Sequence, residues 1–308
     1  MDPLTHCLAG ITIANLGLKE VVPEAGWVVA GASVLPDIDY VTRFWGDRNF
    51  LRYHRVFTHS IVGAVLSSAI WAGGFYLIWP SSGYWPLFFL SLIGFGSHIF
   101  MDFLCPHGEK LLYPFSKRWY ARERFVFFDP YFMALPAVGL ILREVFTRFS
   151  LIVSWSAFSA LIVYWAFREW SYRRCLGVLT RVRKKNRELV RADLSPIPGS
   201  LLFWRLVGEA NNQYLIARIN AFTLNVDEER SIPKPVRDNY ISRAEQSEVV
   251  KHFLESAMYP MVESRLQGDR RIITWWDLAY IHREKKPQVR VILSEGNEIL
   301  KENFIIWK

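Results

Sequence analysis

Long apolar runs dominate the first half of the chain. Between Val56 and Met101 there is no Asp, Glu, Lys or Arg. A helix needs about 20 mostly apolar residues to cross a bilayer. Four stretches come close to that length, namely Phe57–Pro80, Tyr84–Leu104, Phe125–Leu142 and Phe149–Phe167. The pattern therefore predicts a mainly α-helical fold, a polytopic bundle of transmembrane helices.

Two shorter apolar segments, Pro3–Leu18 and Ala25–Leu35, precede these spans. Each is short for a crossing helix, so three arrangements stay open: a tilted pair, a re-entrant hairpin, or helices packed inside the bundle. Asp2 suits an N-cap and Pro3 suits the first helical position. We therefore expect the first helix to begin almost at the start of the chain.

The last third carries short strand-like runs instead. Ser200–Gly208 and Gln213–Phe222 flank Asn211-Asn212, which is typical of a hairpin turn. A helix is predicted to start at Ser242 and to end at Ala257. Further strands are predicted at Arg271–Ile281, Gln288–Ser294 and Ile299–Trp307. The pattern favours a small C-terminal α/β domain with a mostly antiparallel sheet.

Three parts follow from these patterns. Residues 1–170 form a membrane-embedded domain, residues 171–198 a basic juxtamembrane linker, and residues 199–308 a soluble domain. Among the 308 residues, 51% are apolar and 16% aromatic, which excludes a disordered chain. The three cysteines are odd in number and have no paired spacing, which argues against a disulfide framework. No basic segment precedes the first apolar run, so we expect a retained N-terminus.

The distribution of Lys and Arg predicts an orientation, because basic loops stay on the cytoplasmic side. One set of connections, together with the start of the tail, holds Arg43, Arg48, Arg52, Arg55, Lys110, Lys117, Arg118, Arg122, Arg124, Arg173, Arg174, Arg181, Arg183, Lys184, Lys185 and Arg187. The opposite side has only Lys19, Arg143 and Arg148. We therefore expect the basic side and the C-terminal domain to be cytoplasmic.

The basic stretch at residues 173–191 could bind nucleic acid or the acidic headgroups of membrane lipids. It begins where the last predicted span ends. A cluster in that position is typical of lipid binding. We therefore expect acidic headgroups as its partner, and no nucleic acid.

Ionisable side chains near membrane segments are costly and mark functional sites. Here they are His6, Asp37, Asp39, His54, His59, His98, Asp102 and His107. The predicted topology puts all of them on the same side of the membrane, at a similar depth. His98 and Asp102 are four residues apart and share one helix face. We therefore predict that these residues form one site.

Imidazoles and carboxylates without thiolates favour Zn²⁺, with Mn²⁺ or Fe as alternatives. Six or more ligands exceed the needs of one tetrahedral zinc, so we expect two or three ions. Such a centre suits phosphoester hydrolysis, because the metals generate hydroxide and neutralise phosphate oxygens. A site at headgroup level makes a phospholipid or a lipid-linked phosphate an attractive substrate.

Three other interpretations stay open. The polar residues could form a network that only stabilises the bundle. A metal-ion or proton transporter would also need them, near the bilayer midplane and on both sides of it. A non-catalytic regulatory membrane protein would hold a structural metal in a closed coordination shell. His252 and His282 have no acidic cluster around them in the sequence and are expected at the surface.

Four motifs resemble those of the bacterial inner-membrane, metal-dependent hydrolases, some of which are linked to LexA regulation. In chain order they are Met1-Asp2-Pro3-Leu4-Thr5-His6, Leu35-Pro36-Asp37-Ile38-Asp39, His54-Arg55-x-x-Thr58-His59-Ser60 and His98-x-x-x-Asp102. The resemblance covers residues 1–170 and implies a multi-pass hydrolase of the bacterial inner membrane. It also implies that Asp129, before Pro130, is a metal ligand or a group that supports one.

The order of His and Asp residues is also similar to that of the zinc-dependent phospholipases C and single-strand nucleases. That likeness implies metal ligands at His6, Asp37 or Asp39, His59, His98 and Asp102, with His107 as the next histidine. The later ligands of that superfamily have no counterpart in Tyr113–Phe128, so two ions are as compatible as three. His54 and Arg55 are our candidate catalytic residues, placed to bind phosphate or to support the ligands.

Overall fold

A computed structural model describes residues 1–106, 108–185, 189–278, 281 and 286–305. The chain divides into two units. The first contains Met1–Tyr40, His54–Arg174 and Pro196–Leu202, and the second contains Val41–Tyr53, Cys175–Ser195 and Phe203–Lys308. The division differs from the predicted three parts, because a short segment near the N-terminus belongs with the C-terminal strands.

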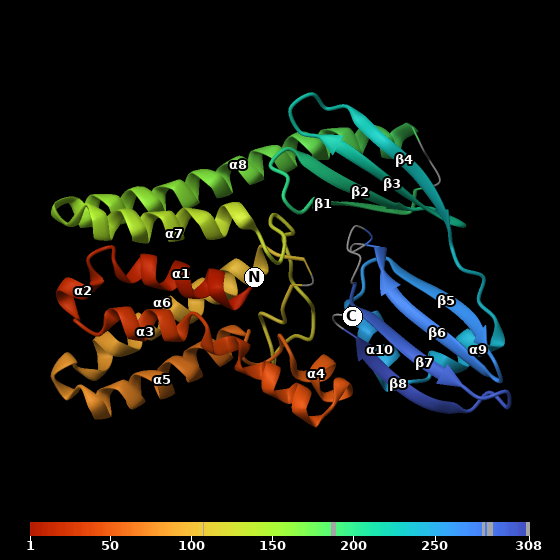
Figure 1. Cartoon of the computed structure of the whole chain (residues 1–308), viewed down its shortest axis with the longest axis horizontal. Helices are drawn as coiled ribbons and strands as arrows, with labels where there is room; N and C mark the ends of the chain where they lie inside the picture. Colours follow the sequence, from red (N-terminus) through yellow and green to blue (C-terminus); the bar gives the residue numbers. More distant parts are fainter. Residues whose placement is uncertain (107, 186–188, 279–280, 282–285, 306–308) are drawn as a thin grey trace. The chain divides into compact units, whose positions relative to one another are not determined.

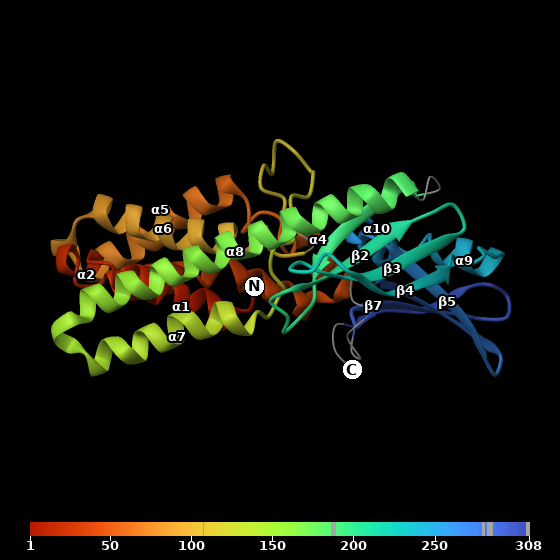
Figure 2. The ribbon, with the colours of Figure 1, turned by 90° about the horizontal axis from the view of Figure 1, so that it is seen from above.

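The first unit is helical. Its elements are α1 (Pro3–Ala14), α2 (Leu18–Val21), α3 (Ala25–Ala32), the 3₁₀ segment η1 (Leu35–Trp45), α5 (Ile61–Ile78), η2 (Pro80–Ser82), α6 (Tyr84–Phe103), α7 (Pro130–Val145), η3 (Thr147–Phe149) and α8 (Ser150–Lys185). The last residues of η1 and of α8 belong to the second unit. Helices α1, α3, α5 and α6 run side by side (Figure 1), and the loop between α6 and α7 extends beyond the helix ends (Figure 2).

Among the described residues, three helical stretches are long and apolar enough to cross a membrane: Ile61–Ile78, Tyr84–Phe103 and Thr147–Val182. Large apolar side chains cover their outer faces; Leu77, for example, is 83% exposed. The predicted span Phe125–Leu142 is instead the 16-residue helix α7. It begins later because Asp129 caps it and Pro130 occupies its first turn. Helix α8 continues through most of the predicted linker.

The second unit contains two four-stranded sheets. The first has the order β1 (Arg191–Pro196), β2 (Phe203–Glu209), β3 (Gln213–Asn220) and β4 (Val226–Pro233). The second has the order β5 (Pro260–Gln267), β6 (Arg270–Asp277), β7 (Gln288–Leu293) and β8 (Ile299–Ile305), with antiparallel neighbours throughout. Helices α4 (Asp47–Tyr53), α9 (Asn239–Ala244) and α10 (Glu248–Ser256) complete the unit.

The predicted hairpin at Asn211-Asn212 is confirmed, since Glu209 of β2 pairs with Tyr214 of β3 in antiparallel register. The single predicted sheet is wrong. Strand β4 gave no signal because its residues are polar and exposed almost throughout. The predicted helix Ser242–Ala257 is two helices, because the Ser247 hydroxyl accepts a hydrogen bond from the Val250 amide and starts a new helix.

Small residues let α3 and α6 approach closely. A Cβ atom placed on Gly94 of α6 would lie 2.6 Å from both the Ala32 Cβ and the Val29 carbonyl oxygen of α3. Gly96, two residues further on, has nothing within 4 Å of such an atom. The close approach brings the end of α3 against the part of α6 that carries His98.

We expect Gly94→Ala to lower the melting temperature of the purified protein by several degrees. The added methyl forces two helix backbones apart, which typically costs about 1–3 kcal/mol. The control Gly96→Ala adds the same methyl in open space and should not lower it. Equal melting temperatures for the two variants, measured by circular dichroism, would contradict this account of the packing.

Candidate metal centre

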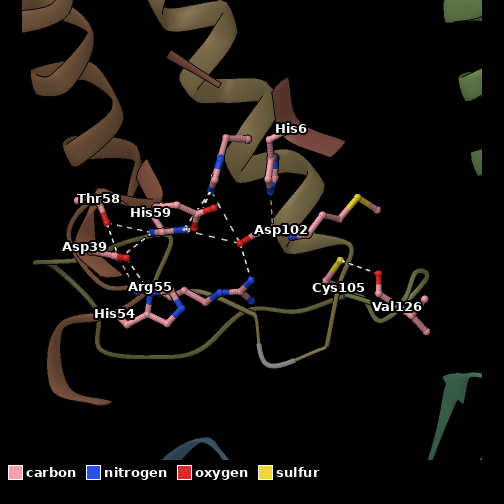
Figure 3. Close-up of polar contacts among 12 residues, drawn as sticks. His6, Asp39, His54, Arg55, Thr58, His59, Asp102, Cys105 and Val126 are labelled. Atoms are coloured by element: carbon pink, nitrogen blue, oxygen red, sulfur yellow. Dashed lines mark hydrogen bonds and ion pairs between the residues drawn. The ribbon is translucent and has the colours of Figure 1, made fainter. Parts of the chain in front are cut away.

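Four side chains converge where the helices of the first unit end. Asp37 comes from η1, His59 lies just before α5, and His98 and Asp102 lie near the end of α6. Each offers one ligand atom, and these atoms all lie within 4.8 Å of one another. His59, His98 and Asp102 are fully buried (Figure 3 shows His59 and Asp102). These four residues, called the metal centre below, could hold a metal ion.

The ligand atoms of the centre face one another closely. The two Nε2 atoms of His59 and His98 are 3.1 Å apart. From His59 Nε2 the nearest carboxylate oxygens are 3.5 Å away on Asp37 and 3.7 Å away on Asp102. From His98 Nε2 the corresponding distances are 3.8 and 3.9 Å. Two nitrogen and two oxygen donors around one point are a set that Zn²⁺, Mn²⁺ or Fe accepts.

Hydrogen bonds on the far side of each ring fix which nitrogen is protonated. His98 Nδ1 lies 2.8 Å from the Ser33 carbonyl oxygen, which can only accept, so Nδ1 carries the proton. His59 Nδ1 lies 3.0 Å from the Thr58 hydroxyl oxygen and 3.3 Å from an Asp39 oxygen. The Thr58 hydroxyl donates its own proton to Asp39, so it accepts from His59 Nδ1. Both Nε2 atoms are then left with a free lone pair directed at the other ring. This arrangement orients imidazoles for a metal and fits a bound cation.

Asp39 lies behind His59 and is not one of the four grouped ligands. Its carboxylate accepts hydrogen bonds from the Arg55 amide at 2.9 Å, the Thr58 hydroxyl at 2.8 Å and His54 Nδ1 at 2.7 Å. Burial opposes ionisation, but the hydrogen bonds from His54 and His59 outweigh it and hold the pKa of Asp39 well below its usual range. The sequence predicted Asp39 as a ligand; the structure places it where it orients His59.

Arg55 and His54 flank the centre. The Arg55 guanidinium is buried and lies 2.7 Å from an Asp102 oxygen. Its backbone has φ +60°, which is costly for a residue other than glycine. Hydrogen bonds from its amide to Asp39 and from the Lys110 amide to its carbonyl hold it in place. Burial lowers the pKa of His54, although Asp39 beside it partly raises it.

His6 lies beside the four grouped ligands and contacts one of them, His98. Its ring stacks on His98 with centroids 3.8 Å apart, and its Nε2 lies 3.3 Å from the second Asp102 oxygen. Its Nδ1 is buried and has no hydrogen-bond partner among the residues that the structure describes. The Met1 amino group also contacts Asp102. Asp102 therefore connects His6 with the centre.

The structure does not bring Asp129 into the centre. Its carboxylate caps α7 by accepting from the Tyr131 and Phe132 amides, and it also accepts from the Tyr164 hydroxyl at 3.0 Å. His107, considered above as a further ligand, lies outside the described residues, as does His282.

Glu109 is a buried acid that the sequence does not predict. It is fully buried, and neither carboxylate oxygen has a hydrogen-bond partner within the described ranges. Burial raises its pKa well above the usual 4.5, although Arg55 and the chain's amino group oppose the shift. Its backbone pairs with Tyr120 in both directions, which holds it in position. Nothing in the sequence around Glu109 separates it from a solvated loop acid.

Comparison with known proteins identifies a family of inner membrane proteins and a bacterial relative. The family model of the YdjM inner membrane protein matches residues 1–173. The uncharacterized protein YfhP of Bacillus subtilis is 23% identical over 322 aligned residues, which cover 100% of this chain and 95% of YfhP. No solved structure matches the chain significantly. Neither match is to a phospholipase C or a nuclease, so that part of the resemblance stays a prediction.

We expect His59→Ala to abolish stoichiometric metal binding and Asp39→Asn to weaken it about 10–100-fold. The first change removes a ligand, and the second removes the acceptor that orients it. His252→Ala, in α10 of the second unit, is the matched control and should keep wild-type metal content. Metal content is measured by mass spectrometry after dialysis against Zn²⁺. Unchanged zinc in His59→Ala would contradict the assigned centre.

We expect the stability of the wild-type protein to fall as pH rises, because the buried Glu109 carboxyl resists ionisation. The Glu109→Gln variant should not show this fall. A carboxyl whose pKa is higher in the folded than in the unfolded chain destabilises the fold as pH climbs from about 4.5 toward the raised value. The difference is about 1.4 kcal/mol for each pH unit inside that window. Melting temperatures of both proteins between pH 5 and 8 should diverge as pH rises, with the variant more stable. Parallel curves would show that Glu109 is not buried in this way.

Proposed function

The chain belongs to the YdjM inner membrane protein family, and from this premise we propose that it is a membrane-bound, metal-dependent hydrolase of phosphoesters. The observation that carries the proposal is the buried centre of His59, His98, Asp37 and Asp102. Its donor set is that of catalytic Zn²⁺, Mn²⁺ or Fe sites rather than of closed cysteine sites. A bound divalent cation there supplies Lewis acidity and an activated water for attack on phosphorus.

Arg55 is the proposed phosphate-binding residue. Its guanidinium has five donors, and Asp102 is its one ion-pair partner among the described residues, so the other donors could bind an incoming anion. A planar guanidinium suits the oxygen pairs of a phosphate better than an ammonium does. The three contacts of Arg55 described above hold it at the edge of the centre. It would stabilise negative charge that grows on phosphate oxygens during attack.

His54 is the proposed proton-transfer group. Asp39 lies at its Nδ1 and accepts from it, so the proton sits on that nitrogen and Nε2 is the unprotonated nitrogen of the ring. Because burial lowers its pKa, the ring is neutral near pH 7 and able to accept a proton. Its Nε2 could take a proton from the attacking water and return it to the leaving oxygen.

A second ion is proposed on the His6 side of Asp102. One Asp102 oxygen lies near His59 and His98, and the other lies near His6. Asp102 and His6 would hold this second ion. When bound, it would supply further stabilisation of the negative charge on the attacking and leaving oxygens of a phosphoryl displacement. Asp129, outside this group, is proposed only as a structural support.

A lipid headgroup or lipid-linked phosphate is the proposed substrate. The centre lies where spans α5 and α6 meet their connecting loops, and exposed apolar side chains such as Ile38 (59%) and Phe57 (44%) flank its ligands in sequence. The basic stretch of α8 that follows the last span is proposed to bind acidic headgroups on the cytoplasmic side. Nucleic acid is not a proposed partner.

We expect the purified protein, loaded with Zn²⁺ or Mn²⁺ in lipid nanodiscs, to release phosphate from a phosphodiester or a phospholipid. Arg55→Lys should lower kcat/KM about 10–100-fold with metal content unchanged, because a point charge replaces the guanidinium. Arg52→Lys changes an exposed arginine three residues away and serves as the control. Full metal loading without hydrolysis of any ester tested would favour a regulatory protein with a structural metal.

A further inference from the structure

One short segment lies, in sequence, between residues at the metal centre, but it folds with the C-terminal unit. Asp39 precedes it and His54 follows it, yet Val41–Tyr53 belongs to the C-terminal unit. Within that unit, Phe50 of α4 is only 3% exposed. It lies in one apolar cluster with residues of α9, α10, β5, β6, β7 and β8. The C-terminal unit therefore includes α4 in its hydrophobic core.

Polar contacts attach α4 to the same core. The Asp47 carboxylate accepts a hydrogen bond of 2.6 Å from the Phe304 amide of β8. The ring of Phe304 stacks near that of Phe50, with centroids 6.2 Å apart. Arg48 and Glu248 of α10 form an ion pair at 3.6 Å, but both are largely exposed, so the pair adds little. Phe50 and Asp47 are thus two residues that attach α4 to the core.

The residues on either side of the same segment, Tyr40 and His54, contact each other in the helical unit. The Tyr40 ring meets the His54 ring edge-on, with centroids 4.6 Å apart. Asp39 bonds His54 and the Arg55 amide, as described above. The chain thus leaves the centre at Tyr40, contributes α4 to the C-terminal unit, and returns at His54. Both ends of this excursion are next to groups that orient His59.

We propose that Phe50 and Asp47 are positioning residues for the metal centre, and that one role of the C-terminal unit is to hold the Val41–Tyr53 excursion in a single conformation. The inference rests on the proposed metal centre. If α4 left its core, the released segment would regain backbone freedom. The contacts of Asp39, His54 and the strained Arg55 would then form only at a cost in the conformational entropy of the released segment. Ligand geometry, and with it metal affinity, depends in this way on packing that no ligand touches.

The test is a Co²⁺ titration of the full chain in detergent, followed by the visible absorption of the bound ion. We expect Phe50→Ala to bind Co²⁺ about tenfold more weakly and with an altered spectrum. Phe50→Leu, which keeps most of the apolar volume, should restore both. Leu206→Ala is the matched control: Leu206 is equally buried in β2, in the other sheet, and should leave Co²⁺ binding unchanged.

Asp47→Ala tests the same idea without opening a cavity. It removes only the acceptor for the Phe304 amide, and we expect Co²⁺ affinity to fall several-fold while circular dichroism stays that of the wild type. Affinity within twofold of wild type in both Phe50→Ala and Asp47→Ala would overturn the inference and leave the metal centre standing. An equal loss in Leu206→Ala would also overturn it, since general damage would then suffice. No Co²⁺ binding by the wild type would refute the metal centre itself, and this inference with it.

Discussion

The centre depends on two imidazole nitrogens that face each other at 3.1 Å in a buried site. Their rings are protonated on the opposite nitrogen, because the Ser33 carbonyl accepts from His98 Nδ1, and Thr58 and Asp39 accept from His59 Nδ1. Neither Nε2 can therefore donate to the other, and two lone pairs and two carboxylates meet without a proton between the rings. A buried polar group left without a partner costs about 1–3 kcal/mol, and more when charged. A divalent cation would accept both lone pairs and balance the charge of the two carboxylates, which is why we propose one.

Helix packing sets this geometry. Ser33, at the end of α3, accepts from His98 through its carbonyl and donates from its hydroxyl to the His6 carbonyl of α1. The two contacts connect α1, α3 and α6 at the level of the ligands. They require α3 to lie close to α6, which Gly94 permits. Small residues in apolar helices thus contribute to the chemistry by placing a backbone carbonyl, although they carry no reactive group themselves.

The sequence predicted correctly the features that depend on the spacing of residues along the chain. The expected span Tyr84–Leu104 differs from α6 by one residue, and His98 and Asp102 share a helix face as their spacing predicts. Spacing could not separate Asp37 from Asp39. Only the three-dimensional course of η1 puts one carboxylate at the centre and the other behind His59. Likewise, α4 was not predicted as part of the C-terminal unit, because its docking depends on a contact between Asp47 and Phe304 of β8, 257 residues away in the chain. No pattern in the sequence predicts that Glu109 is buried.

X-ray absorption spectroscopy of the zinc-loaded protein measures the proposed coordination directly. The account predicts a first shell of nitrogen and oxygen at about 2.0–2.2 Å, with the outer-ring scattering of two or more imidazoles. The spectrum of the His98→Ala variant should lack the contribution of one imidazole. A shell containing sulfur, one without imidazole, or a zinc surrounded by water alone would contradict the account.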